Sequence, residues 1–161
     1  MSILMMEYMK KWKVMILGYR SDVRIATSKK GFDVIKKVVE DRLQQINQLD
    51  CNLLDCLDIK KENDEVCYFG WNNIKWYDGI KGYEEVDAIL EGLDELEEKD
   101  ISYRFARIGE SYDDYEQFSH DGIDEVDLKS YVPYPSVSRY FDDEYLIFEL
   151  NAKEKDLEVS L

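Results

Sequence analysis

The densest group of residues that could do chemistry lies between Arg107 and Lys129. This stretch contains no lysine or arginine, but it holds His120, the only histidine of the chain. A histidine beside carboxylates suits general acid–base catalysis, and clustered carboxylates also suit Mg²⁺, Mn²⁺ or Ca²⁺. The segment is therefore a candidate for a catalytic cluster, a metal loop, a surface that binds a basic partner, or a solvated loop. Its eight carboxylates are Glu110, Asp113, Asp114, Glu116, Asp121, Asp124, Glu125 and Asp127.

Known catalytic and metal-binding motifs are absent from the sequence. There is no P-loop, G-x-G-x-x-G, H-E-x-x-H or paired C-x-x-C motif, and His120 does not accompany a nucleophile elbow. The D-x-D-x-D-G spacing of an EF-hand is also absent. We therefore expect no enzymatic activity, no cofactor and no resident metal. The competing hypothesis is a metal-dependent or hydrolytic enzyme centred on Asp113, Asp114, His120 and Asp121.

The acidity of the chain is regional. The net charge is −15 over 161 residues, yet residues 1–60 carry 11 basic and 8 acidic side chains, whereas residues 61–161 carry 10 and 28. Such a field repels nucleic acid and anionic membranes and attracts basic protein surfaces. The sequence thus argues against direct binding to nucleic acid or membranes and favours a basic protein partner.

A second acidic group falls on a predicted helix. Its carboxylates recur opposite a Val/Ile/Leu stripe, and like charges four positions apart cost a few tenths of a kcal/mol for each pair. The acids of 110–127 are expected to lie in an exposed loop, where replacing Asp113, Asp114 and Glu116 by amides should leave the fold intact. Tyrosines beside acids add apolar area and hydrogen bonds at interfaces. The predicted partner-binding residues are Asp87, Glu91, Asp94, Glu95, Glu98, Glu110, Asp113, Asp114, Glu116, Asp121, Tyr131 and Tyr134.

An internal repeat predicts the elements that position these residues. Residues 14–40 align with residues 64–91 at an offset of 51, and Lys30-Gly31-Phe32 then falls on Lys81-Gly82-Tyr83. Each copy is predicted to form a strand, a polar turn, a second strand, an amphipathic helix and a third strand, and the third strands would lie at residues 51–59 and 101–108. The turn of the second copy would lie at residues 72–73, and the helix of the first would begin with Thr27 or Ser28 as N-cap.

The predicted fold class is α+β. We expect one domain over residues 1–161, with a mainly antiparallel sheet of about six strands and two helices on one face. The first ββαβ unit would span residues 10–60 and the second residues 61–109. Residues 110–150 would form the acidic segment and a Tyr/Pro-rich extended arm that ends in an edge strand, and residues 151–161 a frayed tail.

Small size, acidity, tyrosine content and the stretch "RIGESYDDYE" are the features on which this chain resembles a known class of proteins. It resembles small acidic accessory proteins of phages and mobile elements, including anti-restriction and anti-CRISPR DNA mimics. Carboxylates on neighbouring turns of a helix, about 5–6 Å apart at Cβ, approximate the spacing of phosphates along a nucleic-acid strand. The resemblance implies an inhibitor that occupies the basic groove of a nucleic-acid enzyme, and it assigns no role to any single residue.

Compartment and assembly complete the sequence-based expectations. No signal peptide or membrane span is apparent, and three cysteines cannot close into a disulfide framework, so a cytoplasmic protein with buried thiols is expected. The leading hypothesis is a non-enzymatic acidic binding protein. Besides the enzyme hypothesis, a third possibility is a plain assembly module, a homodimer formed by pairing edge strands.

Overall fold

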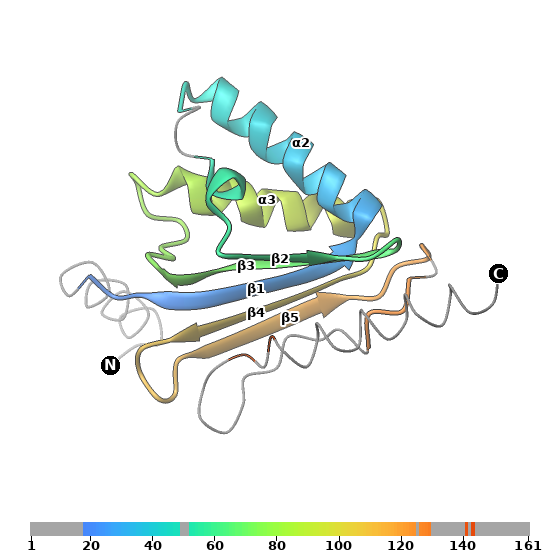
Figure 1. The fold of residues 1–161 in the computed structure, drawn as a ribbon. Coiled ribbons are helices and arrows are strands. Elements are labelled where there is room, and N and C mark those ends of the chain that lie inside the picture. The colour runs from blue at the N-terminus through green and yellow to red at the C-terminus, as the bar shows by residue number, and fades with distance from the viewer. Residues whose placement is uncertain (1–17, 49–51, 125, 130–140, 142, 144–161) are drawn as a thin grey trace, which may run out of the picture.

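The computed structural model describes residues 18–48, 52–124, 126–129, 141 and 143. These residues form a five-stranded antiparallel sheet with the order β2-β3-β1-β4-β5. Figure 1 shows the two helices on one face of the sheet, which confirms the predicted α+β class. The elements are β1 (Ser21–Ser28), α2 (Lys29–Gln45), the 3-10 turn η2 (Leu53–Cys56), β2 (Ile59–Glu62), β3 (Val66–Ile74), α3 (Glu84–Glu98), β4 (Tyr103–Gly109) and β5 (Tyr115–His120).

The order of elements reveals two interleaved βαβ units. One unit is β1-α2-β2 and the other is β3-α3-β4, and β1 lies between β3 and β4 in the sheet. This arrangement is the split βαβ topology of ferredoxin-like domains, with β5 added beside β4. Because β1 and β3 are neighbours, residues about 50 positions apart in sequence meet in the centre of the sheet.

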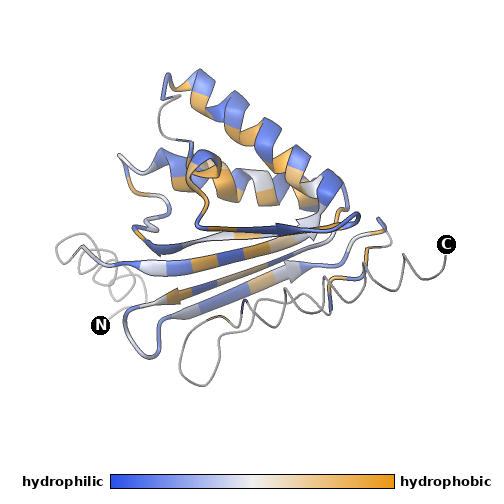
Figure 2. Cartoon of the chain, viewed as in Figure 1, coloured by the Kyte–Doolittle hydropathy of each residue, from blue (hydrophilic) through white to orange (hydrophobic). Residues whose placement is uncertain are grey.

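Both helices form where the apolar stripes predict them. Ser28 is the N-cap of α2, and its hydroxyl accepts a hydrogen bond from the Gly31 amide at 2.9 Å. Figure 2 shows the apolar stripe of each helix turned toward the sheet. A Cβ on Gly92 would lie 3.0 Å from Ile35 Cγ2, so glycine permits the close approach of the helices. The buried stripe residues are Ile35, Val39 and Leu43 on α2 and Val86, Ile89, Leu93 and Leu96 on α3.

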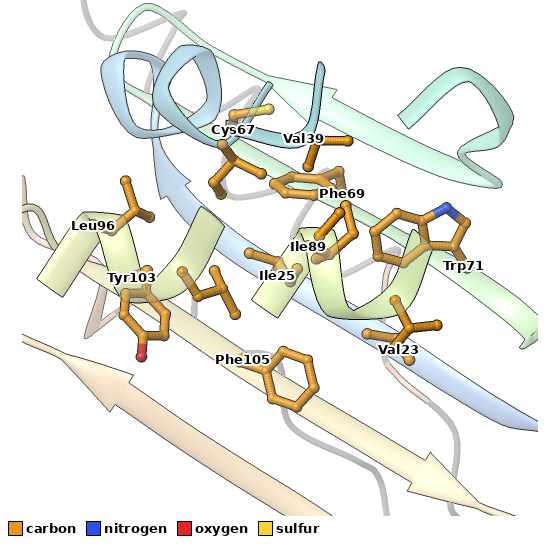
Figure 3. Packing of buried hydrophobic residues seen from close by; sticks show 14 of the residues in the cluster. Val23, Ile25, Val39, Cys67, Phe69, Trp71, Ile89, Leu96, Tyr103 and Phe105 are labelled. Carbon is orange, nitrogen blue, oxygen red and sulfur yellow. The ribbon is translucent and has the colours of Figure 1, made fainter. Parts of the chain in front are cut away.

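The main core lies between the helices and the sheet, as Figure 3 shows. Alternate residues of the three central strands point into it, including Ile25, Phe69 and Phe105, which are all fully buried. Phe69 and Trp71 pack edge to face with ring centroids 6.0 Å apart. Burial of each large apolar side chain stabilises the fold by about 1.5–3 kcal/mol.

The predicted hairpin of the second repeat is wrong. Asn72 and Asn73 lie inside β3, and residues 75–78 form no strand. The register changes from Val23 opposite Trp71 to Ser21 opposite Ile74, so β3 carries one extra residue, a β-bulge. Asn73 takes the positive φ of 53° that this bulge needs. The two asparagines therefore bend a strand instead of ending it, and the unit is βαβ, not ββαβ.

Other boundaries also differ from the prediction. Residues 53–56, expected in a strand, form the turn η2, which Asn52 caps by accepting from the Leu54 amide. The 110–127 segment is not a continuous loop, because residues 115–120 form β5. The first strand of the first repeat and the C-terminal edge strand lie outside the described residues, as does most of the predicted arm. Cys67 is buried as expected, but Cys56 is exposed.

Two small apolar clusters cover part of the helix-free face of the sheet. Leu128 packs against Ala26, Val66 and Tyr68, and Phe141 packs against Ala106 and Ile108. Among the described helices, none has the length and apolar character that crossing a membrane requires.

Candidate functional site

Three carboxylates of the β4–β5 hairpin are paired with arginines of β4. Arg107 lies directly opposite Glu116 in the strand register. Its guanidinium donates to Glu116 Oε2 at 3.0 Å and to both oxygens of Asp114, at 2.6 and 3.0 Å. Asp121, at the other end of β5, is paired with Arg104. These ion pairs therefore join the two strands of the hairpin to each other.

The pKa shifts of Arg107 and Asp121 agree with a structural role for these ion pairs. Burial by itself lowers the pKa of Arg107, but the hydrogen bonds and charges of Asp114 and Glu116 outweigh it and raise the pKa. The hydrogen bond and positive charge of Arg104 lower the pKa of the Asp121 carboxyl. Each shift favours the charged form, so both ion pairs persist at neutral pH.

Gly109 makes room for the Asp114 carboxylate. A Cβ at residue 109 would lie 2.0 Å from Asp114 Oδ2 and 2.5 Å from the Tyr19 hydroxyl. That hydroxyl accepts a hydrogen bond from the Ser111 amide at 2.7 Å. Burial and the hydrogen bond with Asp114 raise the pKa of Tyr19. The turn that follows β4 is thus built around Asp114.

The structure does not bring the hypothetical catalytic cluster together. Asp113 and Asp114 precede β5, whereas His120 is the last of its six residues, so Asp114 and His120 lie about 20 Å apart along the strand. His120 instead places Nε2 2.9 Å from Asp100 Oδ1 and stacks on Tyr103. Across the described ranges, no three His, Cys, Asp or Glu side chains meet in a way that could hold a metal.

The α3 surface differs from the hairpin in how its acids are used. The helix carries eight carboxylates and no basic residue between Glu84 and Glu98. Glu91 contacts Arg42 at 3.3 Å and Glu95 contacts Lys99 at 3.2 Å, both partly exposed. Asp94 and Glu98 are exposed, and neither forms an ion pair with another described residue. We define the α3 acidic surface as Asp87, Glu91, Asp94, Glu95 and Glu98.

A shallow, open pocket of about 260 Å³ lies at one end of the sheet, among Arg20, Asp22, Asn73 and Glu110. Its polar groups already have partners within the chain. Arg20 donates to the Asn73 carbonyl at 2.9 Å through Nη1 and to Glu110 at 2.9 Å through its amide. Asp22 accepts from the Asn73 amide at 2.8 Å. The pocket therefore presents no convergent set of groups for a ligand.

Comparison with known proteins gives no family for this chain: no family model, no curated protein and no solved structure matches it.

The structure divides the twelve predicted partner-binding residues into three groups. The five on α3 lie on one helix, and all but Glu91 and Glu95 are without a cationic partner among the described side chains. Of the five in the hairpin, Asp113 is exposed, Glu110 accepts from a backbone amide, and the other three pair with arginines. Tyr131 and Tyr134 lie outside the described residues.

Sequence reasoning missed the two arginines that pair with Asp114, Glu116 and Asp121. Arg104 and Arg107 interrupt the apolar alternation of "YRFARIG", and that interruption was the available signal. A charged residue within a buried strand needs a partner, and the adjacent acidic segment supplies one.

Proposed function

We propose that this protein is a non-enzymatic binding protein that docks the α3 acidic surface on a basic surface of a partner protein. The supporting observation is the excess negative charge of α3, on which only Glu91 and Glu95 form ion pairs with described residues. Its eight carboxylates include Glu97 and Glu98 in the last turn, which contains no basic residue. Carboxylates at a helix C-terminus oppose the helix dipole by about 0.3–1 kcal/mol each.

Stability of the fold does not account for Asp94 and Glu98. Glu97 has an internal role, because the Tyr103 hydroxyl donates to it at 2.6 Å. Asp94 and Glu98 have no such role and repel each other across one helical turn. The neighbouring helix α2 mixes both signs of charge, with Lys36 and Lys37 near Asp33 and Glu40. A residue pattern that costs stability on one helix only is the kind expected of a binding surface.

The finer proposal is that the partner is a nucleic-acid enzyme and that the α3 acidic surface occupies its basic groove. Regularly spaced carboxylates on a rigid helix resemble a row of phosphates, and the resemblance to phage and mobile-element inhibitors points to the same class of partner. A cytoplasmic setting would follow from such a role.

The proposal is tested by capture from a lysate of the cells that make the protein. Three forms serve as bait: the native chain, Asp94→Asn/Glu98→Gln on α3, and Asp33→Asn/Glu40→Gln on α2. The last pair removes the same charges from exposed positions of the other helix. Proteins bound by the native and α2-variant baits, but lost from the α3 variant, are the expected partners.

Competition with duplex DNA separates the coarse proposal from the fine one. Release of the captured protein by DNA supports occupation of a nucleic-acid groove. Retention in the presence of DNA would contradict the groove while leaving a basic protein partner. Equal capture by all three baits would contradict the α3 surface itself.

A further inference from the structure

A buried arginine on the helix-free face of the sheet has an unusual set of contacts. Arg24 lies in the middle of β1, is only 2% exposed, and points away from the helices. Buried charges require paired and hydrogen-bonded surroundings. The hydrogen bonds of the Arg24 guanidinium fall into two groups.

The first group fixes the guanidinium to the sheet. Nη1 donates to the carbonyls of Val23 and Trp71, both at 2.9 Å. Nη2 donates to Asn72 Oδ1 at 2.6 Å. The Trp71 carbonyl and Asn72 lie at the β-bulge of β3, so the bulge supplies two of these three acceptors. Nε and the remaining Nη2 hydrogen are thereby oriented as a fork.

Gly70 leaves space for the side chain that carries this fork. It lies directly opposite Arg24 in the β1–β3 register. A Cβ at residue 70 would lie 2.0 Å from the Val23 carbonyl oxygen and 2.9 Å from Arg24 Cδ. A glycine inside a strand weakens the strand and often marks a close approach of another group. Here the group is the arginine stem.

The second group of contacts is a bound carboxylate. Asp143 accepts from Arg24 Nε and Nη2, both at 3.1 Å, in a two-pronged pair. The Tyr68 hydroxyl donates to Asp143 Oδ1 at 2.9 Å, and Lys61 Nζ donates to the Asp143 carbonyl at 2.9 Å. Burial and the nearby Asp143 charge raise the pKa of Tyr68, which keeps its hydroxyl a donor.

An aromatic ring completes the bound segment. Phe141, two residues before Asp143, lies with its ring centroid 4.7 Å from Arg24 Cζ and is 6% exposed. A cation beside a desolvated ring gains additional attraction. The sheet therefore contacts both an aromatic side chain and the carboxylate two positions after it.

We infer that Arg24 and Tyr68 form a preorganised carboxylate-binding site on the helix-free face, that Lys61 binds the backbone carbonyl of the same ligand residue, and that Asp143 occupies the site as a ligand from the same chain. Three of the five guanidinium contacts come from the sheet alone, so the fork stays oriented when Asp143 leaves. The site then accepts an acidic peptide with the pattern aromatic-x-Asp from another chain. This inference is independent of the α3 acidic surface.

The test uses the full-length Asp143→Asn chain and a blocked peptide with the sequence of residues 139–145, RYFDDEY. Binding is followed by NMR through the Arg24 Nε–Hε signal, which is identified by its loss in Arg24→Lys. We expect saturable binding of the peptide to Asp143→Asn and at least tenfold weaker binding to the native chain. The reason is that the tethered Asp143 competes at an effective concentration on the order of millimolar.

Three controls make the result specific. A peptide with Asn in place of Asp143 should bind Asp143→Asn at least tenfold more weakly than the native peptide. Asp113→Asn, an equivalent change at an exposed position, should behave as the native chain. If Asp143→Asn does not fold, Phe141→Ala weakens the tethered ligand while keeping its carboxylate, and it should bind the peptide more tightly than the native chain does.

Several results would overturn the inference. One is equal peptide affinity for the native chain and the variant that folds. Another is absence of binding to that variant, which would leave Arg24 and Asp143 as a structural ion pair only. Equal affinity of the Asp and Asn peptides would show that the carboxylate is not what the site recognises.

Discussion

Replacing Asp114 by asparagine should destabilise the fold, whereas the same change at Asp113 should not. The two residues are adjacent and chemically identical, and the sequence alone predicts that neither contributes to stability. In the structure Asp113 is exposed, but Asp114 forms a two-pronged ion pair with Arg107 at 2.6 and 3.0 Å. The pair of substitutions therefore isolates the contribution of the Asp114 side chain, of which this ion pair is the main part.

The expected magnitude follows from burial of the two partners. The side chain of Arg107 is 15% exposed and that of Asp114 is 30% exposed. Loss of a hydrogen bond to a charged group costs about 1.5–3 kcal/mol, and breaking a fully buried pair costs about 3–5 kcal/mol. Glu116 stays as a second partner of Arg107 at 3.0 Å, and asparagine keeps one acceptor. We therefore expect a loss of about 2 kcal/mol, at the lower end of these ranges.

Thermal and urea unfolding at pH 7 measure this loss. A decrease of 2 kcal/mol should lower Tm by about 4–8 °C in a chain of this size. Asp113→Asn should stay within about 0.5 kcal/mol of the native chain. Equal stability of the two variants would refute the reasoning, because it would mean that Asp114 is no more than a surface acid.

Two further predictions concern groups with shifted pKa values. Burial raises the pKa of Cys67 to about 12. In a Cys51→Ser variant, a thiol reagent at pH 8 should therefore label exposed Cys56 in the folded protein and Cys67 only after unfolding. Similar labelling rates for the two thiols in the folded protein would contradict the buried position of Cys67. The hydrogen bond and charge of Arg104 lower the pKa of Asp121. The ion pair therefore contributes to stability above the unfolded-state pKa of aspartate, and this contribution is lost as pH falls through the lowered pKa of the folded state. Carbon-13 NMR titration should show Asp121 protonating at lower pH than it does in Arg104→Met, and an unchanged midpoint in that variant would refute the pairing.

Local patterns in the sequence were sufficient for the helices and the central strand β4. The apolar stripes predicted both helices, Ser28 capped the first one as expected, and residues 101–108 were predicted as a strand. These features depend on side chains a few positions apart. Their periodicity and capping chemistry are therefore visible without knowledge of the tertiary structure.

Features that depend on distant partners were not predictable in this way. Asn72-Asn73 has the composition of a turn, and only pairing of β3 with β1 converts it into a bulge. The acids of β5 read as a loop because their arginines lie on the neighbouring strand, as Arg107 and Glu116 illustrate. Arg24 and Asp143 are 119 residues apart, so no local pattern relates them. The order of residues in the sequence therefore does not show which acids are paired with arginines and which are not.

The central proposal is that the acids of α3 serve a partner, whereas the arginine-paired acids of the β4–β5 hairpin, Asp114, Glu116 and Asp121, serve the fold. The most direct measurement is the association rate constant with the captured partner, determined at low and at physiological salt for the native chain, Asp94→Asn/Glu98→Gln and Asp33→Asn/Glu40→Gln. Electrostatic steering speeds association and weakens as the Debye length shortens to about 8 Å. We expect the α3 variant to associate about two- to fivefold more slowly at low salt and with less salt dependence, and the α2 variant to match the native chain. Equal rates for all three proteins, or an equal decrease in both variants, would contradict the claim.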